Sequence, residues 1–230
     1  MIDEIISYRT LCDNENVQTL QRGMNFKLNP NYSVILMSQR SNAPYSDKIR
    51  EDGITIEYEW HDEPNSKDIP NPKLIDQPQY TKTWNLTQNG KFIQSIEEYK
   101  KWNAKPERVK VYEKILSWVR SLKWFFNLIN YKIHNDWKRN VFIFILQLSE
   151  NQDDNQKTIH LNLEHTRLIP SEVKKEVWKR DNGKCVLCWE AKNLHFDHDL
   201  PFSKWWTSLT DKNIRLLCMK CNLKKSDKIE

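Results

Sequence analysis

Glycine and long apolar runs are the two features that this 230-residue sequence has least of. Only 4 glycines are present beside 10 tryptophans, whereas glycine ordinarily makes up about 7% of residues. No run of about 18 apolar residues occurs, which excludes a membrane-spanning helix. The opening residues, MIDEIISYRT, lack the apolar stretch of a secretory signal. We therefore expect a cytoplasmic protein without a membrane partner.

The net charge of +5 is too small to indicate a nucleic-acid partner by itself. Its distribution is more informative, because residues 171–230 hold thirteen Lys/Arg against nine Asp/Glu, a balance of +4. A basic segment favours contact with phosphates, since binding releases counterions. A solvated charged face is the commoner explanation of such a segment.

Five apolar runs alternate or are rich in β-branched and aromatic residues, as half-buried strands are. Polar connectors rich in Asn, Asp and Pro separate these runs. Residues 1–25 instead carry a loose helical pattern. The pattern predicts a β-rich part over residues 1–150, built as a curved sheet or open barrel. The five predicted strands lie at residues 32–37, 54–58, 108–115, 125–133 and 141–148.

A polar linker is predicted over residues 151–169, followed by a short helix. Ser171 is a good N-cap for that helix, and a turn signal at residues 181–183 ends it. Residues 170–230 would form a second, smaller part of an α+β protein. The apolar face of the helix would hold Val173, Val177 and Trp178.

Four of the five cysteines form two C-x-x-C pairs, and the fifth, Cys12, is interpreted as a buried structural thiol. In a cytosolic chain such pairs indicate metal ligands rather than disulfides. Two thiolate pairs about 30 residues apart can close a tetrahedral zinc site. Structural zinc contributes on the order of 10–16 kcal/mol to the folding of small modules. The predicted zinc ligands are Cys185, Cys188, Cys218 and Cys221.

A carboxylate stands beside an imidazole between the two cysteine pairs, at Asp197 and His198. This combination suits phosphodiester hydrolysis. A carboxylate can hold a divalent cation against the phosphate, and a neutral imidazole can accept the proton of the attacking water. Asn222 is a candidate second oxygen ligand, or alternatively a residue that starts a helix. Asn213 is a candidate for orienting the imidazole through a hydrogen bond.

This order of residues resembles the HNH endonuclease family. The pattern runs C-x-x-C, D-H-x-x-P, an Asn before an apolar strand, and C-x-x-C-N followed by lysines, across about residues 178–228. The resemblance implies a zinc-pinned ββα-metal fold, with His198 as general base positioned by Asn213. It implies that Asp197 and Asn222 bind a catalytic divalent cation, Mg²⁺ or a similar ion. Double-strand cutting needs two active sites or two visits, which leaves a homodimer open.

Three further residues of the second part have two interpretations each. His195 lies two residues before Asp197, so the two side chains share a face if the segment is a strand. His195 would then assist at the metal or contact a phosphate; the alternative is a surface histidine. Lys224 and Lys225 are candidate phosphate contacts, with a solvated helix face as the alternative.

The first part is similar to the SRA (SET- and RING-associated) domain, a PUA-like fold that flips a modified cytosine out of DNA. The resemblance implies that a flipped base is held between aromatic faces and recognised on its edge by a polar group. Tyr45 and Tyr58 are the candidate faces, and Asp47 is the candidate for the edge. Alternatively, both tyrosines pack against the sheet and Asp47 caps a turn. The similar segments include YSVILMSQ at 32–39, YSDKIREDG at 45–53, ITIEYEWHD at 54–62 and RVKVYEK at 108–114.

Together the two resemblances imply a restriction endonuclease that cuts double-stranded DNA carrying modified cytosine. Two alternatives stay open. One is an HNH restriction or nicking enzyme that recognises unmodified DNA, and the other is a zinc module that binds DNA without cutting it. The intact Asp197, His198 and Asn222 argue against the second alternative.

Tryptophan stands where both families lead us to expect glycine. Tight turns and zinc knuckles favour glycine because it tolerates positive φ; only Trp178 fits its place on a helix face. Some bacterial lineages read the codon UGA as glycine and others as tryptophan. Our hypothesis is that nine tryptophans are glycines in the living protein, and the alternative is that real indoles stack along a DNA channel. The nine are Trp60, Trp84, Trp102, Trp118, Trp124, Trp137, Trp189, Trp205 and Trp206.

Overall fold

The computed structural model describes residues 3–40, 43–60, 62–102, 104–150, 168–198 and 210–225. It confirms an α+β fold that is rich in strands. Within these ranges, none of the helices is long and apolar enough to span a membrane. The first part comprises β1 (Glu4–Ser7), α1 (Tyr8–Asn14), β2 (Met24–Asn29), β3 (Tyr32–Met37), β4 (Lys48–Ile49), β5 (Thr55–Glu59), the 3-10 turn η1 (Pro72–Leu74), α2 (Gln88–Lys100), β6 (Glu107–Lys114), β7 (Val119–Asn135) and β8 (Asn140–Leu148). The second part comprises α3 (Ser171–Arg180), β9 (Leu194–His198), the 3-10 turn η3 (Asp211–Asn213), β10 (Ile214–Cys218) and α4 (Met219–Lys225).

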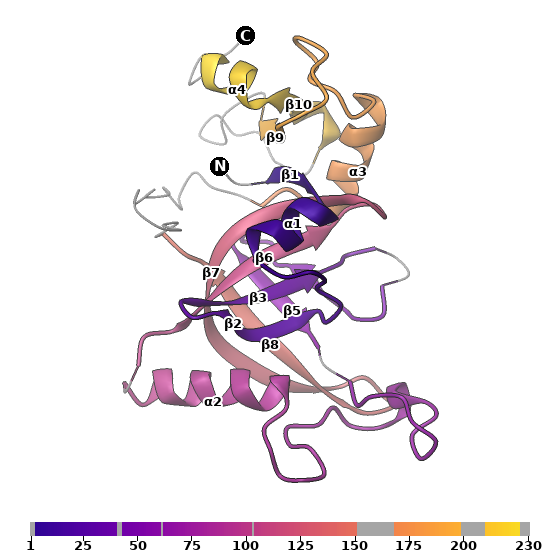
Figure 1. Cartoon of the computed structure of the whole chain (residues 1–230), viewed down its shortest axis with the longest axis vertical. Coiled ribbons are helices and arrows are strands. Elements are labelled where there is room, and N and C mark those ends of the chain that lie inside the picture. Colours follow the sequence, from indigo (N-terminus) through magenta and orange to yellow (C-terminus); the bar gives the residue numbers. More distant parts are fainter. Residues whose placement is uncertain are drawn as a thin grey trace.

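One ten-stranded sheet runs through both parts. Its order is β10-β9-β1-β7-β6-β3-β2, and β8, β5 and β4 continue from β7. Among the described pairs, β3 with β6 is parallel and the others are antiparallel. The long strand β7 shares one edge between two partners, since its first residues pair with β1 and its later residues with β8. Figure 1 shows β7 as a curved strand running the length of the first part.

The five predicted strands are confirmed as β3, β5, β6, β7 and β8, with β7 longer than predicted. They enclose an apolar core that α2 completes from one end (Figure 1). No helix is predicted from the sequence at the position of α2, because its buried apolar residues are few and lie among polar ones. Thr87 caps the helix by accepting a hydrogen bond from the backbone N–H of Gly90. The buried apolar residues of α2 are Phe92, Ile93 and Ile96.

The helical pattern predicted over residues 1–25 is wrong for the first residues. There β1 lies between β7 and β9, pairing Glu4 with Leu122 on one side and His195 on the other. Pairing on both edges outweighs the weak helical signal of four residues. The helix α1 begins directly afterwards, with Ser7 as its N-cap.

The predicted helix after the linker is confirmed as α3, and it ends at the expected turn. Its N-cap is wrong, because Pro170 holds that position and Ser171 is the first helical residue. The Ser171 hydroxyl instead bonds to the side chains of Gln39 and Glu113, in the first part of the chain. The predicted linker 151–169 lies outside the described residues except for its last two, and the division into two domains stays a prediction.

Four buried charges join α3 to the strands beneath it. The ammonium of Lys174 contacts the carboxylate of Asp3 and lies 3.1 Å from Glu113 Oε2. The ammonium of Lys123 lies 2.9 Å from the same Glu113 oxygen. Burial alone would raise the pKa of Asp3, but the two lysines lower it well below its ordinary value. Two acids and two lysines therefore form a neutral cluster in which each charge has a partner.

Replacing Lys174 by Met should destabilise the protein by roughly 3–5 kcal/mol, because removal of one partner leaves buried charge uncompensated. Urea unfolding followed by circular dichroism measures this. Lys175→Met is the matched control, since Lys175 is the next residue of α3 and pairs with the exposed Glu172; such a surface pair contributes about 0–1 kcal/mol. Equal stability losses in the two variants would contradict the role of the buried cluster.

Candidate metal centre and active site

The four predicted zinc ligands lie together at one end of the β9–β10 hairpin. Their Sγ atoms all lie within 4.8 Å of one another, and those of Cys188 and Cys218 are 3.5 Å apart. Tetrahedral zinc with Zn–S bonds of about 2.3 Å needs sulfurs roughly 3.8 Å apart. The cluster therefore fits a structural zinc ion.

Backbone hydrogen bonds shape the first of the two cysteine turns. The N–H of Cys185 donates to Glu190 O, and the N–H of Trp189 donates to Cys185 O. Burial acts to raise the pKa of Cys185, but backbone donors, that of Cys218 foremost, outweigh it and lower the pKa to about 7. The local backbone thus favours the thiolate, which is the form that binds metal.

Asp197 and His198 end β9, and β10 lies antiparallel beside them. Ile214 pairs with His198, which puts Asn213 directly before the partner of the predicted base. The Nε2 atom of His198 is buried and has no hydrogen-bond partner among the residues that the structure describes. Burial lowers the pKa of His198. The imidazole is therefore held in its neutral form, with a nitrogen free to exchange a proton.

Lys225 departs from its predicted role as a phosphate contact. It is buried, and its ammonium lies 2.6 Å from Asp197 Oδ2 and also contacts His198 O. A positive charge thus already compensates the carboxylate that is predicted to hold a cation. Lys224 is exposed, so its interpretation as a phosphate contact stays open. Asn222 lies within α4 and is half-buried, in the helix that also carries Lys225.

His195 is not the surface histidine of the alternative interpretation. Its side chain is buried, and burial lowers its pKa to about 4. It is paired with Glu4 of β1 and Leu217 of β10, so it lies where the N-terminal strand meets the hairpin. His195 therefore stays neutral at neutral pH and does not attract a phosphate by charge.

Arg215 is a residue that the sequence analysis missed. It pairs directly with Asp197 across the β9–β10 hairpin, and side chains of directly paired residues lie on the same face of a sheet. A guanidinium beside the carboxylate that is predicted to bind metal suits a phosphate ligand. The alternation of β10 could have indicated this face, but the pairing partner of Arg215 required the hairpin register.

The candidate base-reading residues gather at the ends of β3 and β5. Asp47 is buried and bridges the two strands, accepting the N–H of Ser38 at Oδ2 (2.8 Å) and the N–H of Glu59 at Oδ1 (3.1 Å). Burial raises the pKa of Asp47 to about 8. Both backbone bonds favour a structural contribution from Asp47, whatever else it binds.

Tyr45 is held by contacts that the sequence did not indicate. Its hydroxyl donates to Asp62 Oδ2 (3.0 Å), and Asp62 in turn pairs with the buried guanidinium of Arg139 (2.7 Å). The ammonium of Lys73 lies 3.7 Å from the centroid of the Tyr45 ring. Tyr45 is therefore fixed at the edge of the sheet with one ring face in contact with a cation.

Tyr58 does not present a free ring in this structure. It is fully buried in the main core, and its hydroxyl donates to Gly23 O (2.7 Å). The alternative interpretation, that this tyrosine packs against the sheet, describes it better. Between Tyr45 and Gly23 lies the indole of Trp60, whose ring centroid is 4.0 Å from that of Tyr45.

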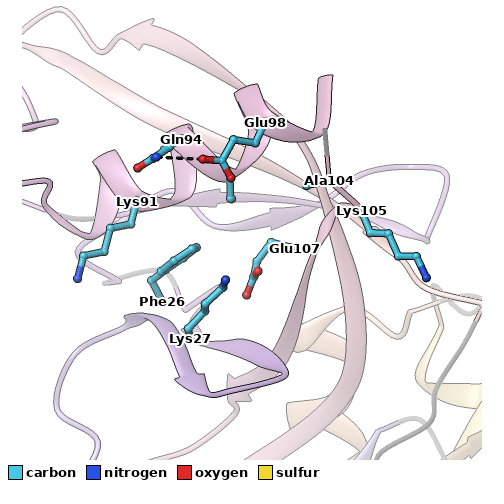
Figure 2. Close-up of a pocket in the computed structure, with 9 residues that line it drawn as sticks. Phe26, Lys27, Lys91, Gln94, Glu98, Ala104, Lys105 and Glu107 are labelled. Atoms are coloured by element: carbon cyan, nitrogen blue, oxygen red, sulfur yellow. Dashed lines mark hydrogen bonds between the residues drawn. The ribbon is translucent and has the colours of Figure 1, made fainter. Parts of the chain in front are cut away.

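A separate pocket of about 290 Å³ lies between α2, β2 and the start of β6 (Figure 2). Its lining carries charges of both signs, and Gln94 donates to Glu98 across one wall (3.0 Å). None of the predicted site residues lines it. Because both signs of charge line it, the pocket favours neither anions nor cations. No ligand is predicted for it from the sequence.

Comparisons with known proteins give one family match within the second part. Residues 185–228 match the family model of the HNH endonuclease. This confirms the HNH resemblance over the segment that holds the metal centre. A search of curated proteins finds no match.

Solved structures similar to this chain include SRA domains. The SUVH5 SRA domain with hemi-methylated CG DNA is 16% identical, with a TM-score of 0.43, covering 68% of this chain and 93% of that one. The same domain bound to fully hydroxymethylated CG DNA is 16% identical, with a TM-score of 0.44, covering 66% and 91%. Arabidopsis thaliana SUVH6 is 16% identical, with a TM-score of 0.41, covering 76% and 28%. SRA is the family that the first part resembles in sequence.

Replacing Cys218 by Ala should remove bound zinc, because three thiolates and water bind the ion far more weakly than four thiolates. Metal analysis of the purified protein by plasma mass spectrometry measures this. Cys12→Ala is the matched control, since Cys12 is a buried cysteine of the first part that lies outside the thiol cluster. Unchanged zinc content in Cys218→Ala would contradict a four-thiolate site.

Proposed function

We propose that this protein is a metal-dependent DNA endonuclease whose second part cuts and whose first part selects DNA carrying modified cytosine. The observation that carries the proposal is the placement of Asp197 and His198 on one hairpin with the four-thiol cluster. The match of residues 185–228 to the HNH endonuclease family supports the cutting activity. Restriction of foreign DNA is the biological role that such an activity would serve.

The two oxygen donors that the HNH resemblance implies would suit a catalytic divalent cation of the Mg²⁺ type. Asp197 and Asn222 offer oxygen ligands, which hard cations prefer. When bound, such a cation would polarise the scissile phosphate and neutralise its charge. The ammonium of Lys225 lies 2.6 Å from Asp197 Oδ2, so a cation would have to displace this ammonium or bind at the other carboxylate oxygen.

The proton transfer is assigned to His198. Its imidazole, which the lowered pKa keeps neutral, would accept a proton at Nε2 from the attacking water in the tautomer that carries its own proton on Nδ1. Asn213 would orient the ring, because it directly precedes the residue that pairs with His198. Arg215, on the same face as Asp197, would hold a phosphate oxygen.

The selection of modified cytosine rests on the SRA resemblance of the sequence and on the cluster around Tyr45. The Tyr45 ring contacts the Lys73 ammonium and the Trp60 indole, so a flipped base would stack on it in place of the indole. Asp47, two residues further along the chain, has a pKa of about 8. A carboxyl group that is partly protonated near neutral pH can donate as well as accept at a base edge. The homodimer and the recognition of unmodified DNA stay predictions from the sequence.

His198→Ala should lower the rate of DNA cleavage by roughly 10²- to 10⁴-fold, the contribution of a general base. DNA binding should be unchanged, because His198 is not proposed to hold the DNA. Cleavage of a labelled duplex with added Mg²⁺ and gel-shift binding measure the two effects. His134→Ala is the control, since His134 is an exposed histidine near the far end of β7. Full activity in His198→Ala would contradict the assignment.

Cleavage of methylated, hydroxymethylated and plain duplexes of one sequence tests the selection. We expect faster cutting of at least one modified duplex, because stacking of a flipped base on an aromatic ring contributes about 1–3 kcal/mol. The comparison is made with the chain as printed and with Trp60→Gly. Equal cutting of all three duplexes by both chains would contradict the modified-base proposal and leave the nuclease proposal intact.

A further inference from the structure

Five tryptophans adopt the left-handed backbone conformation that favours glycine. Their φ angles lie between 58° and 73°, in the range of the true glycines Gly53 (68°) and Gly183 (62°). In this region the Cβ of an L-residue crowds the following carbonyl oxygen, and bulky side chains are genuine outliers. The five residues are Trp84, Trp102, Trp124, Trp137 and Trp189.

Other residue types in this region follow the ordinary preference. Apart from Lys27, the remaining described non-glycine residues with positive φ are Asn or Asp, which tolerate it through local hydrogen bonds of their side chains. Tryptophan has no such compensation. A scarce and bulky residue type therefore occupies positions that only glycine adopts without strain.

The indoles at four of these positions contribute almost nothing to packing. Trp84 is 81% exposed, Trp102 92%, Trp137 97% and Trp189 71%. Buried contacts that could offset the backbone strain are therefore missing at these four sites. Trp124 differs, since it packs partly against the core next to α1.

Two of the five tryptophans lie at positions where glycine is common: one follows the end of α2, and the other lies at a bulge between β6 and β7. Trp102 directly follows the C-cap of α2 and donates its N–H to Tyr99 O; this is the position after a helix where glycine is commonest. Trp124 lies at the register shift between β6 and β7, and one type of β-bulge has a left-handed glycine.

The remaining three positions are tight turns. Trp137 lies in the β7–β8 hairpin turn, where Asp136 N–H donates to Arg139 O. Trp84 donates its N–H to Thr81 O in a turn, and Trp189 closes the first cysteine turn. Each of these turns holds its tryptophan at positive φ, the conformation that glycine adopts without steric cost.

We infer that residues 84, 102, 124, 137 and 189 are glycines in the protein as its own cell makes it. We include residue 60 in this inference for a separate reason. A codon that this cell reads as glycine is then written here as tryptophan. Trp118 is exposed but is not left-handed, so the structure gives no backbone reason for glycine there. Trp205 and Trp206 lie outside the described residues.

Residue 60 is included because its indole fills the site beside Tyr45. A Cβ on Gly23 would meet the Trp60 ring at 3.0 Å and Tyr58 Oη at 2.9 Å, so indole, tyrosine and glycine are closely packed. The Tyr45 and Trp60 centroids are 4.0 Å apart, closer than the roughly 4.5–7 Å of ordinary aromatic pairs. Glycine at residue 60 would open a space between Tyr45 and Tyr58. This consequence rests on the proposed function.

Thermal unfolding tests the left-handed positions in the full chain. Trp84→Gly, Trp102→Gly, Trp137→Gly and Trp189→Gly should each raise Tm by about 2–4 °C. Trp118→Gly is the matched control, since it removes an equally exposed indole from a backbone without positive φ, and Tm should not rise. Trp178→Gly should lower Tm, because Trp178 packs against the core of the second part. Gains no larger than that of Trp118→Gly would overturn the backbone argument.

Peptide mass spectrometry of the protein isolated from its own cells tests the identity directly. The tryptic peptide 83–91 contains residue 84 as its one printed tryptophan. A mass corresponding to glycine at residue 84 is expected. A mass corresponding to tryptophan there would overturn the inference, whatever the effect of the substitutions on Tm.

The opening of the pocket is tested by DNA binding in a His198→Ala background, which prevents cutting. Trp60→Gly should bind a methylated duplex roughly tenfold more tightly than the printed chain does, because a stacked base takes the place of the indole. Trp84→Gly, in a distant turn, should leave binding unchanged. Equal affinity of Trp60→Gly and of the printed chain for the methylated duplex would overturn the proposed opening of the pocket alone. No preference in either chain would overturn that consequence and the modified-base proposal, while the glycine identities would still be decided by mass.

Discussion

The pairing of β1 with both β7 and β9 determines how the two parts of the chain lie relative to each other. Four residues at the start of the chain continue the sheet of the first part into the hairpin of the second. Ile5 of this strand packs against both apolar clusters of the second part. Below α3, the neutral cluster of Asp3, Glu113, Lys123 and Lys174 adds directional contacts to the same junction. The orientation of the candidate active site thus depends on sheet pairing rather than on the segment that connects the parts.

The β9–β10 hairpin separates the four-thiol cluster from the candidate catalytic residues. At one end, Cys218 pairs with Leu194 and the four thiols gather; at the other end, Ile214 pairs with His198. Four residues of a strand span roughly 13 Å. Soft thiolates suit zinc, whereas carboxylate and amide oxygens suit Mg²⁺. The same two strands can therefore hold a structural ion and a catalytic ion without competition between them.

Backbone conformation links the composition of the chain to its turns. Glycine is scarce in the printed sequence, and yet the fold needs left-handed residues at a helix end, a strand irregularity, a hairpin and a cysteine turn. The strain is local and lies mostly in exposed positions. The packing of the protein core therefore does not depend on this strain. Trp60 is a different case, because its indole occupies the site beside Tyr45.

Local patterns were enough to predict the five main strands, α3 and the cysteine cluster. Strand runs are continuous in the sequence, and C-x-x-C pairs bring their own geometry. The helix α2 was not predicted, because Phe92, Ile93 and Ile96 are too few to give a clear helical pattern in a polar segment. The N-cap of α3 was wrong because Ser171 bonds to residues far away in the sequence.

By itself the sequence determined which residue types were available for chemistry: four thiols, the Asp197-His198 pair and the two asparagines, together with the resemblances that they carry. Only the tertiary structure decided their partners. It placed Arg215 opposite Asp197, Lys225 against the same carboxylate, His195 beside Glu4 of β1 and Tyr58 in the core. The physical reason is that the cross-strand register and burial depend on contacts between residues distant in the sequence, which no local pattern encodes.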